Sequence, residues 1–238
     1  MIDIHSHILP GVDDGAGDQE TSLSILSILA DNGIKTVCLT PHVNKKENDP
    51  SPLLLQAKYN ELNRLAAVSK LDITLLQGAE ILFSPGIKGI IKNNPLCFLG
   101  ESSMYYLLEF INNQIPSIAE KVIFDAMLEG VVPVFAHVER YDWRYRRIAD
   151  LMGYFKKNSA MLQVNSGSLL GKYGRTIKKR AVKLVKEGWC DVIAGDIHTK
   201  EDAVKYNLRK ASQFVTKQFG RQKSRQLLFE MPAKIIQK

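Results

Sequence analysis

Two histidines near the start of the chain have the spacing of a metal-binding pair. His5 and His7 follow a short apolar run with strand character. In an extended chain, residues two apart project to the same face, so both imidazoles can reach one metal ion. A turn at Pro10 and Gly11 then brings the carboxylate of Asp14 close by. A site of this kind needs further ligands from elsewhere in the chain.

Further candidate ligands follow expected strands. The apolar runs 36–39, 105–108 and 131–135 each lead to a histidine or an acidic residue. In barrels of parallel strands, functional groups lie at the carboxyl ends of the strands. All five histidines of the chain belong to this set, and none falls on an expected helix. The candidates beyond the opening segment are His42, Glu80, Glu109, His137, Asp196 and His198.

Strand-like and helix-like segments alternate along the whole chain, which predicts parallel strands joined by right-handed crossovers. The expected fold is one α/β domain spanning residues 1–238, with seven strands arranged as a barrel that is closed or nearly so. Strands are expected near 2–4, 36–39, 73–76, 105–108, 131–135, 161–164 and 192–194. Helices are expected from Asp18 to 32, over 54–65, 116–130 and 176–187, with one or two more at the end. Residues 84–96 are expected to be irregular, with at most a short helix.

Composition narrows the chemistry less than the motifs do. The net charge of +7 suits either nucleic acid or an anionic substrate, and no nucleic-acid motif is present. The three cysteines are widely spaced, and no arginine lies six positions after any of them, which excludes a cysteine-nucleophile phosphatase loop. Neither a basic leader nor a long apolar span is found, so the expected location is the cytoplasm.

The ordered motifs resemble the PHP (polymerase and histidinol phosphatase) superfamily of metal-dependent phosphoesterases. More narrowly, the chain is similar to the CpsB/YwqE-type manganese-dependent protein-tyrosine phosphatases of capsule and exopolysaccharide systems. The resemblance rests on DIHSHILPGVDDG, LTPH, GAEI, LLEF, AHVERY, QVNSGSLLGKYG and GDIH, which run in order from Asp3 to His198. It implies a distorted TIM-like (β/α)₇ barrel with three divalent metals. Mn²⁺ is the expected ion, and Fe²⁺ or Zn²⁺ also suits mixed imidazole and carboxylate ligands.

The resemblance implies a role for each candidate. The first ion would be held by His5, His7, Glu80 and Asp196, the second by Glu80, Glu109 and His137, and the third by Asp14, His42 and His198. Glu80, Asp196 and Arg140 are the expected catalytic residues. The planar fork of Arg140 suits a bidentate clamp on phosphate. Asn165 and Ser166 are further expected substrate contacts.

The expected reaction is hydrolysis of phosphotyrosine by attack of a metal-bridging hydroxide on phosphorus, without a phosphoenzyme. The expected substrate is a phosphotyrosine protein, in particular the tyrosine-rich tail of a bacterial tyrosine kinase. Three alternatives stay open: a small-molecule phosphomonoesterase such as a histidinol phosphatase, a non-catalytic metal-binding regulatory protein, and a phosphodiesterase or nuclease.

Four further features have two interpretations or depart from the family pattern. Asp13 is expected to form a turn rather than bind metal, and Asp3 to orient a ligand histidine. Residues 141–147 alternate aromatic and basic side chains, typical of either a peptide-docking rim or an ordinary amphipathic surface. Family members often carry an arginine shortly after the last motif, where this chain has Lys200, Glu201 and Asp202.

Overall fold

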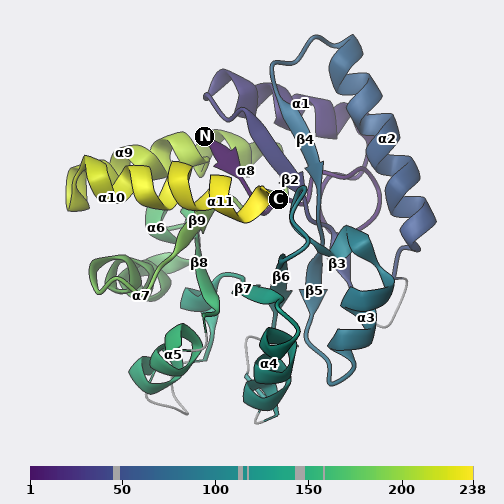
Figure 1. The fold of residues 1–238 in the computed structure, drawn as a ribbon. Helices are drawn as coiled ribbons and strands as arrows, with labels where there is room; N and C mark the ends of the chain where they lie inside the picture. The colour runs from purple at the N-terminus through teal and green to yellow at the C-terminus, as the bar shows by residue number, and fades with distance from the viewer. Residues whose placement is uncertain (45–48, 112–114, 117, 143–147, 158, 238) are drawn as a thin grey trace.

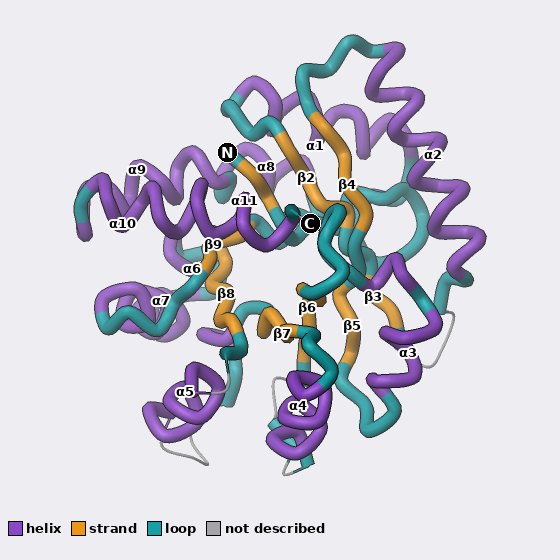
Figure 2. The backbone as a smooth tube through the Cα atoms, in the orientation of Figure 1, coloured by secondary structure: helices purple, strands orange, loops and turns teal. Residues whose placement is uncertain are grey.

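The computed structural model describes residues 1–44, 49–111, 115–116, 118–142, 148–157 and 159–237 (Figure 1). Short strands gather at its centre, and helices surround them on the outside (Figure 2). The proposed docking rim at 141–147 lies largely outside the described residues, because 143–147 are not among them.

Every strand pair in the described part of the chain is parallel, as expected. The strands run in the orders β1-β2-β4 and β3-β5-β6-β7-β8-β9. The strands are β1 (Ile2–Asp3), β2 (Thr36–Leu39), β3 (His42–Val43), β4 (Thr74–Gln77), β5 (Glu80–Leu82), β6 (Tyr105–Glu109), β7 (Val132–Phe135), β8 (Met161–Asn165) and β9 (Val192–Ala194). Parallel pairing with intervening helices confirms the α/β class.

The seven expected strands are present, and two of them are followed by a further short strand that was not expected. β2 is followed by β3 after Pro41, which has no N–H to donate to a ladder, and β4 is followed by β5 after Gly78 and Ala79. The two further strands are linked, because the Glu80 amide donates to the Pro41 carbonyl at 3.0 Å. The segments that follow β1 and β9 also lie side by side, because Ser6 pairs with Ile197.

The expected helices are present, and the chain adds several more. Asp18 caps α1 by accepting from the Thr21 amide at 2.7 Å, and Ser51 caps α2. The C-terminal part holds more helices than the one or two expected. The helices are α1 (Gln19–Asp31), α2 (Pro52–Val68), α3 (Ile87–Asn93), α4 (Ala119–Leu128), α5 (Ile148–Lys157), α6 (Ser166–Leu170), α7 (Gly174–Lys186), α8 (Lys200–Lys205), α9 (Leu208–Phe219), α10 (Arg221–Arg225) and α11 (Met231–Ile236).

The last helix closes the amino ends of the strands. Ile235 is fully buried in the apolar cluster that also contains Ile4, Val134 and Val192. The Ile236 carbonyl accepts from the Glu101 amide at 3.0 Å, and Figure 1 shows the C-terminus close to the centre of the fold. The polar interior therefore lies at the opposite, carboxyl ends. In the part of the chain that is described, no helix has the length and apolar character needed to cross a bilayer.

Candidate metal centre

The nine candidate ligands meet at the carboxyl ends of the strands. Six of them are buried, although imidazoles and carboxylates are costly to bury without partners. They are His5 and His7 after β1, Asp14 in the following loop, His42 in β3, Glu80 at the start of β5, Glu109 at the end of β6, His137 after β7, and Asp196 and His198 after β9. Residues as far apart in sequence as His5 and His198 therefore share one site.

His5, His7, Glu80 and Asp196 form the deepest part of the site and are called the inner group below. His5 Nε2 lies 3.1 Å from His7 Nε2, 3.4 Å from Glu80 Oε2 and 3.4 Å from Asp196 Oδ1. His7 Nε2 is 3.3 Å from the same Glu80 oxygen and 3.5 Å from the same Asp196 oxygen. Four ligand atoms thus face one small volume, and none of these side chains is more than 3% exposed.

The two facing imidazoles of the inner group fit a bound cation. His7 Nδ1 donates to Asp13 Oδ2 at 2.7 Å, and His5 Nδ1 lies 2.9 Å from Gln163 Oε1. Both oxygens can only accept, so in each neutral ring the proton belongs on Nδ1 and the lone pair on Nε2. Two lone pairs at 3.1 Å repel each other unless a proton or a metal ion lies between them. The donor set is therefore the one that a divalent ion requires.

Glu80 connects the inner group to a second set of ligands. Its Oε1 is 3.0 Å from His137 Nε2, and its Oε2 is 3.1 Å from His42 Nδ1. Glu109 completes this set, with Oε2 3.8 Å from His137 Nε2 and Oε1 3.0 Å from His42 Nδ1. The last pair lacks the alignment of a hydrogen bond, and both atoms are buried without a hydrogen-bond partner. Glu80 has the position of a bridging carboxylate.

Asp14, His42 and His198 form the outer group at the mouth of the site. Asp14 Oδ1 lies 3.3 Å from His42 Nε2 and 3.7 Å from His198 Nε2. The Asp14 side chain is 66% exposed and that of His198 is 22% exposed, in contrast to the inner group. The His198 ring stacks on His7 at 4.1 Å between centroids, which joins the two groups.

The structure brings all nine candidates together, and two of them lie close to a second set of ligands as well as to the expected one. His7 comes within reach of the outer group, and His42 within reach of Glu80 and Glu109. In each of three sets of residues, the ligand atoms all lie within 4.8 Å of one another. The sets are His7, Asp14, His42 and His198; His5, His7 and Asp196; and His42, Glu80 and Glu109.

The backbone is unusual at two of the ligands. His137 has φ 37° and Asp196 has φ 52°, the left-handed region that non-glycine residues rarely adopt. Such conformations persist where the surrounding structure imposes them, commonly at functional sites. Gly195 allows a close approach here, since a Cβ atom would lie 2.2 Å from Asp3 Oδ2. Asp3 Oδ1 accepts from the amides of both Gly195 and His5, so Asp3 orients the backbone rather than a histidine ring.

The charges of the site oppose one another strongly when only protein atoms are considered. Burial alone would lower the pKa of His5, but Glu80 and Asp196 raise that pKa to about 9. Burial likewise opposes the charged form of His42, but Glu109 and Glu80 raise its pKa to about 10. Despite burial, His5 holds the pKa values of both Glu80 and Asp196 below their usual range, together with His137. An incoming cation must therefore displace protons from the imidazoles.

The three residues expected at the substrate occupy different places. Arg140 lies at the rim, 31% exposed, with Nη1 3.4 Å from Asp196 Oδ2 and the guanidinium 5.0 Å from the centre of the Tyr173 ring. Asn165 and Ser166 are buried. The side-chain Nδ2 of Asn165 donates to Asp196 Oδ2 at 2.6 Å, and the Ser166 hydroxyl donates to the carbonyl of Tyr206. Both polar groups are therefore engaged with the protein.

Three residues have contacts at the site that were not expected from the sequence. Asp13 holds the ring of His7 and also accepts from the His42 amide at 3.2 Å, so its contribution exceeds that of a turn former. Gln163 contacts His5, and Tyr173 lies under Arg140. The available signal was the spacing of Gln163 and Asn165, two polar residues on one face of an otherwise apolar strand.

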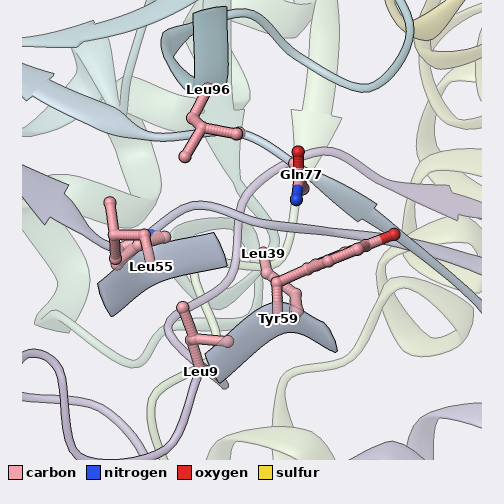
Figure 3. A pocket seen from close by; sticks show the side chains of 8 residues that line it. Leu9, Leu39, Leu55, Tyr59, Gln77 and Leu96 are labelled. Carbon is pink, nitrogen blue, oxygen red and sulfur yellow. The ribbon is translucent and has the colours of Figure 1, made fainter. Parts of the chain in front are cut away.

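An apolar cavity elsewhere offers no comparable chemistry. It has a volume of about 10 Å³, at most the room for one water. Figure 3 shows Leu9, Leu39, Leu55, Leu96 and Tyr59 around it. The Tyr59 hydroxyl donates to the Leu75 carbonyl at 2.8 Å and is thus already engaged.

Comparisons with known proteins identify relatives over nearly the whole chain. The family model described as capsular polysaccharide synthesis, CpsB/CapC, matches residues 1–237. Tyrosine-protein phosphatase YwqE of Bacillus subtilis is 31% identical over 92% of this chain and 85% of its own. Tyrosine-protein phosphatase CpsB of Streptococcus pneumoniae is 28% identical over 99% of this chain and 98% of its own.

A solved structure shares the fold over nearly the whole chain. It belongs to the crystal structures of YwqE from Bacillus subtilis and CpsB from Streptococcus pneumoniae, described as metal-dependent tyrosine phosphatases, and it superposes with a TM-score of 0.91. The identity is 29%, with 99% of this chain and 94% of that chain covered. The resemblance inferred from the motifs and the expected barrel-like α/β fold are thus confirmed. The chain belongs to the CpsB/CapC family.

Proposed function

We propose that this protein is a metal-dependent phosphatase that removes phosphate from phosphotyrosine in proteins. The observation that carries the proposal is the convergence of five imidazoles and four carboxylates, with the guanidinium of Arg140 at the rim beside Asp196. The tyrosine-phosphatase activity named for relatives that align over almost the whole chain supports the same activity here.

The cofactor in this proposal is a set of three divalent ions, with Mn²⁺ as the physiological metal. The inner group would hold one, Glu80, Glu109 and His137 a second, and the outer group a third. When bound, such ions supply a hydroxide nucleophile at neutral pH and neutralise charge on the phosphoryl oxygens. Four carboxylates alone would repel a phosphate dianion, so substrate binding requires the metal-loaded site.

The chain's own residues bind and orient the substrate. Arg140 donates from its fork to the phosphoryl oxygens, and its contact with Tyr173 holds the guanidinium at the rim. Asp196 and Glu80 fix the histidines around the reacting volume. Tyrosinate, with a solution pKa of ~10, leaves without strong general-acid assistance. Asn165 and Ser166 act from behind Asp196 in this scheme.

A cysteine nucleophile has no place in this proposal. All three cysteines are buried free thiols. Burial raises the pKa of Cys97 to about 12 and holds the pKa values of Cys38 and Cys190 far above the usual range. A thiolate, the reactive form, is therefore not available at neutral pH. Buried free thiols also suit the reducing cytoplasm, where we place the protein.

The proposed substrate is a bacterial tyrosine kinase of capsule or exopolysaccharide synthesis, acting through its phosphorylated tyrosine tail. The family description in terms of capsular polysaccharide synthesis supports this choice. Residues 1–238 are proposed to act as one domain, because the site draws on side chains from His5 to His198.

The test compares substrates and metals on one preparation. Metal-free protein is titrated with Mn²⁺, Fe²⁺, Zn²⁺ and Mg²⁺, and hydrolysis of phosphotyrosine peptides is compared with that of histidinol phosphate and bis-(p-nitrophenyl) phosphate. We expect Mn²⁺-dependent turnover of phosphotyrosine that persists after thiol alkylation. Preference for histidinol phosphate or the diester, or loss of activity on alkylation, would contradict the proposal.

A further inference from the structure

We infer that Gln163 is a positioning residue, which fixes the tautomer of His5 and couples that ring to Asp196 through Asn165. The inference rests on the proposed metal centre and assigns a role that the ligand set does not contain. Gln163 is fully buried in β8, and Asn165, two residues on, is 1% exposed and projects to the same face.

Three hydrogen bonds connect His5 to Asp196 through these two amides. His5 Nδ1 lies 2.9 Å from Gln163 Oε1. Gln163 Nε2 donates to Asn165 Oδ1 at 2.5 Å, and Asn165 Nδ2 donates to Asp196 Oδ2 at 2.6 Å. The two ends of the series, His5 Nε2 and Asp196 Oδ1, face each other at 3.4 Å across the inner group.

The direction of every bond in this series follows from its last member. The carboxylate of Asp196 can only accept, so Asn165 must present its NH₂ group to it and its oxygen to Gln163. Gln163 must then present its NH₂ group to Asn165 and its oxygen to His5. His5 must donate from Nδ1, which leaves the lone pair on Nε2, the nitrogen that faces the inner group. The opposite orientation of Gln163 would put the ring proton on Nε2 and block ligation.

The Asn165 backbone is held as well. Its amide donates to Glu139 Oε1 at 3.1 Å, and Glu139 is fully buried. His7 reaches the same tautomer by the shorter route of a single carboxylate, Asp13. Two ligand histidines of one group are thus oriented differently, one directly by an acid and the other through two amides. Loss of a hydrogen-bonding partner of this kind behind a metal ligand commonly lowers metal affinity by about 10–100-fold.

The test replaces Gln163 in the full chain and measures metal binding directly. Gln163→Leu removes both bonds, whereas Gln163→Glu keeps an acceptor for His5 and loses the donor to Asn165. Gln77→Leu is the matched control, because Gln77 is a strand glutamine that lines the small apolar cavity instead of the metal centre. Mn²⁺ affinity and stoichiometry are measured by calorimetry and elemental analysis, and the protonated ring nitrogen by long-range ¹H–¹⁵N NMR on zinc-loaded protein.

We expect Gln163→Leu to weaken the binding of one ion at least about tenfold and to shift the His5 Nδ1–H resonance. Gln163→Glu should retain that resonance and lose part of the affinity. Unchanged affinity and resonance in Gln163→Leu, or a loss no larger than that of Gln77→Leu, would overturn the inference. Should Gln163→Leu fail to fold, a Gln163→Glu variant that binds Mn²⁺ with the wild-type affinity would overturn the inference.

Failure of the proposed function gives a different result. A wild-type protein that binds metal and shows the protonated Nδ1 of His5, but leaves phosphotyrosine intact, refutes the phosphatase and leaves the role of Gln163 standing.

Discussion

The inner and outer groups of the metal centre use the same residue types but differ in how firmly they are held. In the inner group every histidine has a second partner behind it, Gln163 for His5 and Asp13 for His7, and exposure is at most 3%. In the outer group Asp14 is 66% exposed, and Arg140, which lies beside Asp196 at the rim, is 31% exposed. The difference shows that the inner group is buried and held by further partners, whereas the outer group and the rim are open to solvent. In the proposed function, the first would fix the metal geometry and the second would meet the substrate.

Glu80 provides the strongest test of the inner group. Its two oxygens contact four histidines, so Glu80→Gln removes a bridging charge and leaves those imidazoles without a common acceptor. We expect loss of at least one bound ion and a decrease in kcat/KM on the order of 10³-fold. Elemental analysis and phosphopeptide kinetics measure both effects. Glu101→Gln, an exposed carboxylate, is the control, and equal effects of the two substitutions would remove the distinction.

Arg140 tests the rim. Arg140→Met should lower kcat/KM for phosphotyrosine by roughly 10²-fold while metal stoichiometry stays at the wild-type value, because its proposed role is to bind the substrate and not the ions. Arg140→Lys should recover only part of the loss, since an ammonium cannot make the bidentate contact. A loss of bound metal in Arg140→Met would place this residue in the inner group instead.

The sequence predicted which residues would gather at the site, because most of them follow an apolar run that forms a strand. Val192–Ala194 also matches its expected bounds. The short strands β3 and β5 were not predicted, because two or three residues carry too little of an apolar pattern. The C-terminal helices were undercounted because α10 and α11 are short and closely follow other helices. Only Gly220 separates α9 from α10, and a π-helical turn, Gln226–Glu230, separates α10 from α11.

The role of Gln163 and that of Asp13 could not be read in the same way. Each depends on which atom faces a residue far away in the sequence or across a turn, and periodicity carries no such information. Asp13 favours a turn by residue type, yet its Oδ2 is placed against His7 by the fold. Orienting contacts of this kind require the three-dimensional arrangement.

The metal-free protein should respond to pH through His5 and His42. The folded pKa of His5, about 9, and that of His42, about 10, exceed the unfolded value of 6.5. Their contribution to stability is therefore complete below pH 6.5 and is lost as the pH rises through 9 to 10. We expect the Tm after chelation to fall across this window. The Tm of metal-loaded protein should change much less, and metal affinity should rise with pH. A flat Tm after chelation would contradict these pKa shifts.

Asp14 tests the outer group on its own. Asp14→Asn keeps the size of the side chain and removes its charge from an exposed position. The affinity for the ion of the outer group should therefore fall by about tenfold, while the other ions stay bound. Calorimetric titration with Mn²⁺ resolves the two classes. Loss of all ions together would mean that the outer group is as integral to the centre as the inner one.

Tyr173 tests the finest part of the comparison, the support of the rim. Its ring lies 5.0 Å from the Arg140 guanidinium and 5.2 Å from the Lys172 ammonium, which attracts both cations to one face of the site. Tyr173→Leu removes the ring, and a partly exposed contact worth ~0.5–1 kcal/mol corresponds to a rise in KM for phosphotyrosine peptides of about 2–5-fold. Tyr173→Phe keeps the ring and should leave KM unchanged. If both variants raise KM equally, the hydroxyl rather than the ring face supports Arg140.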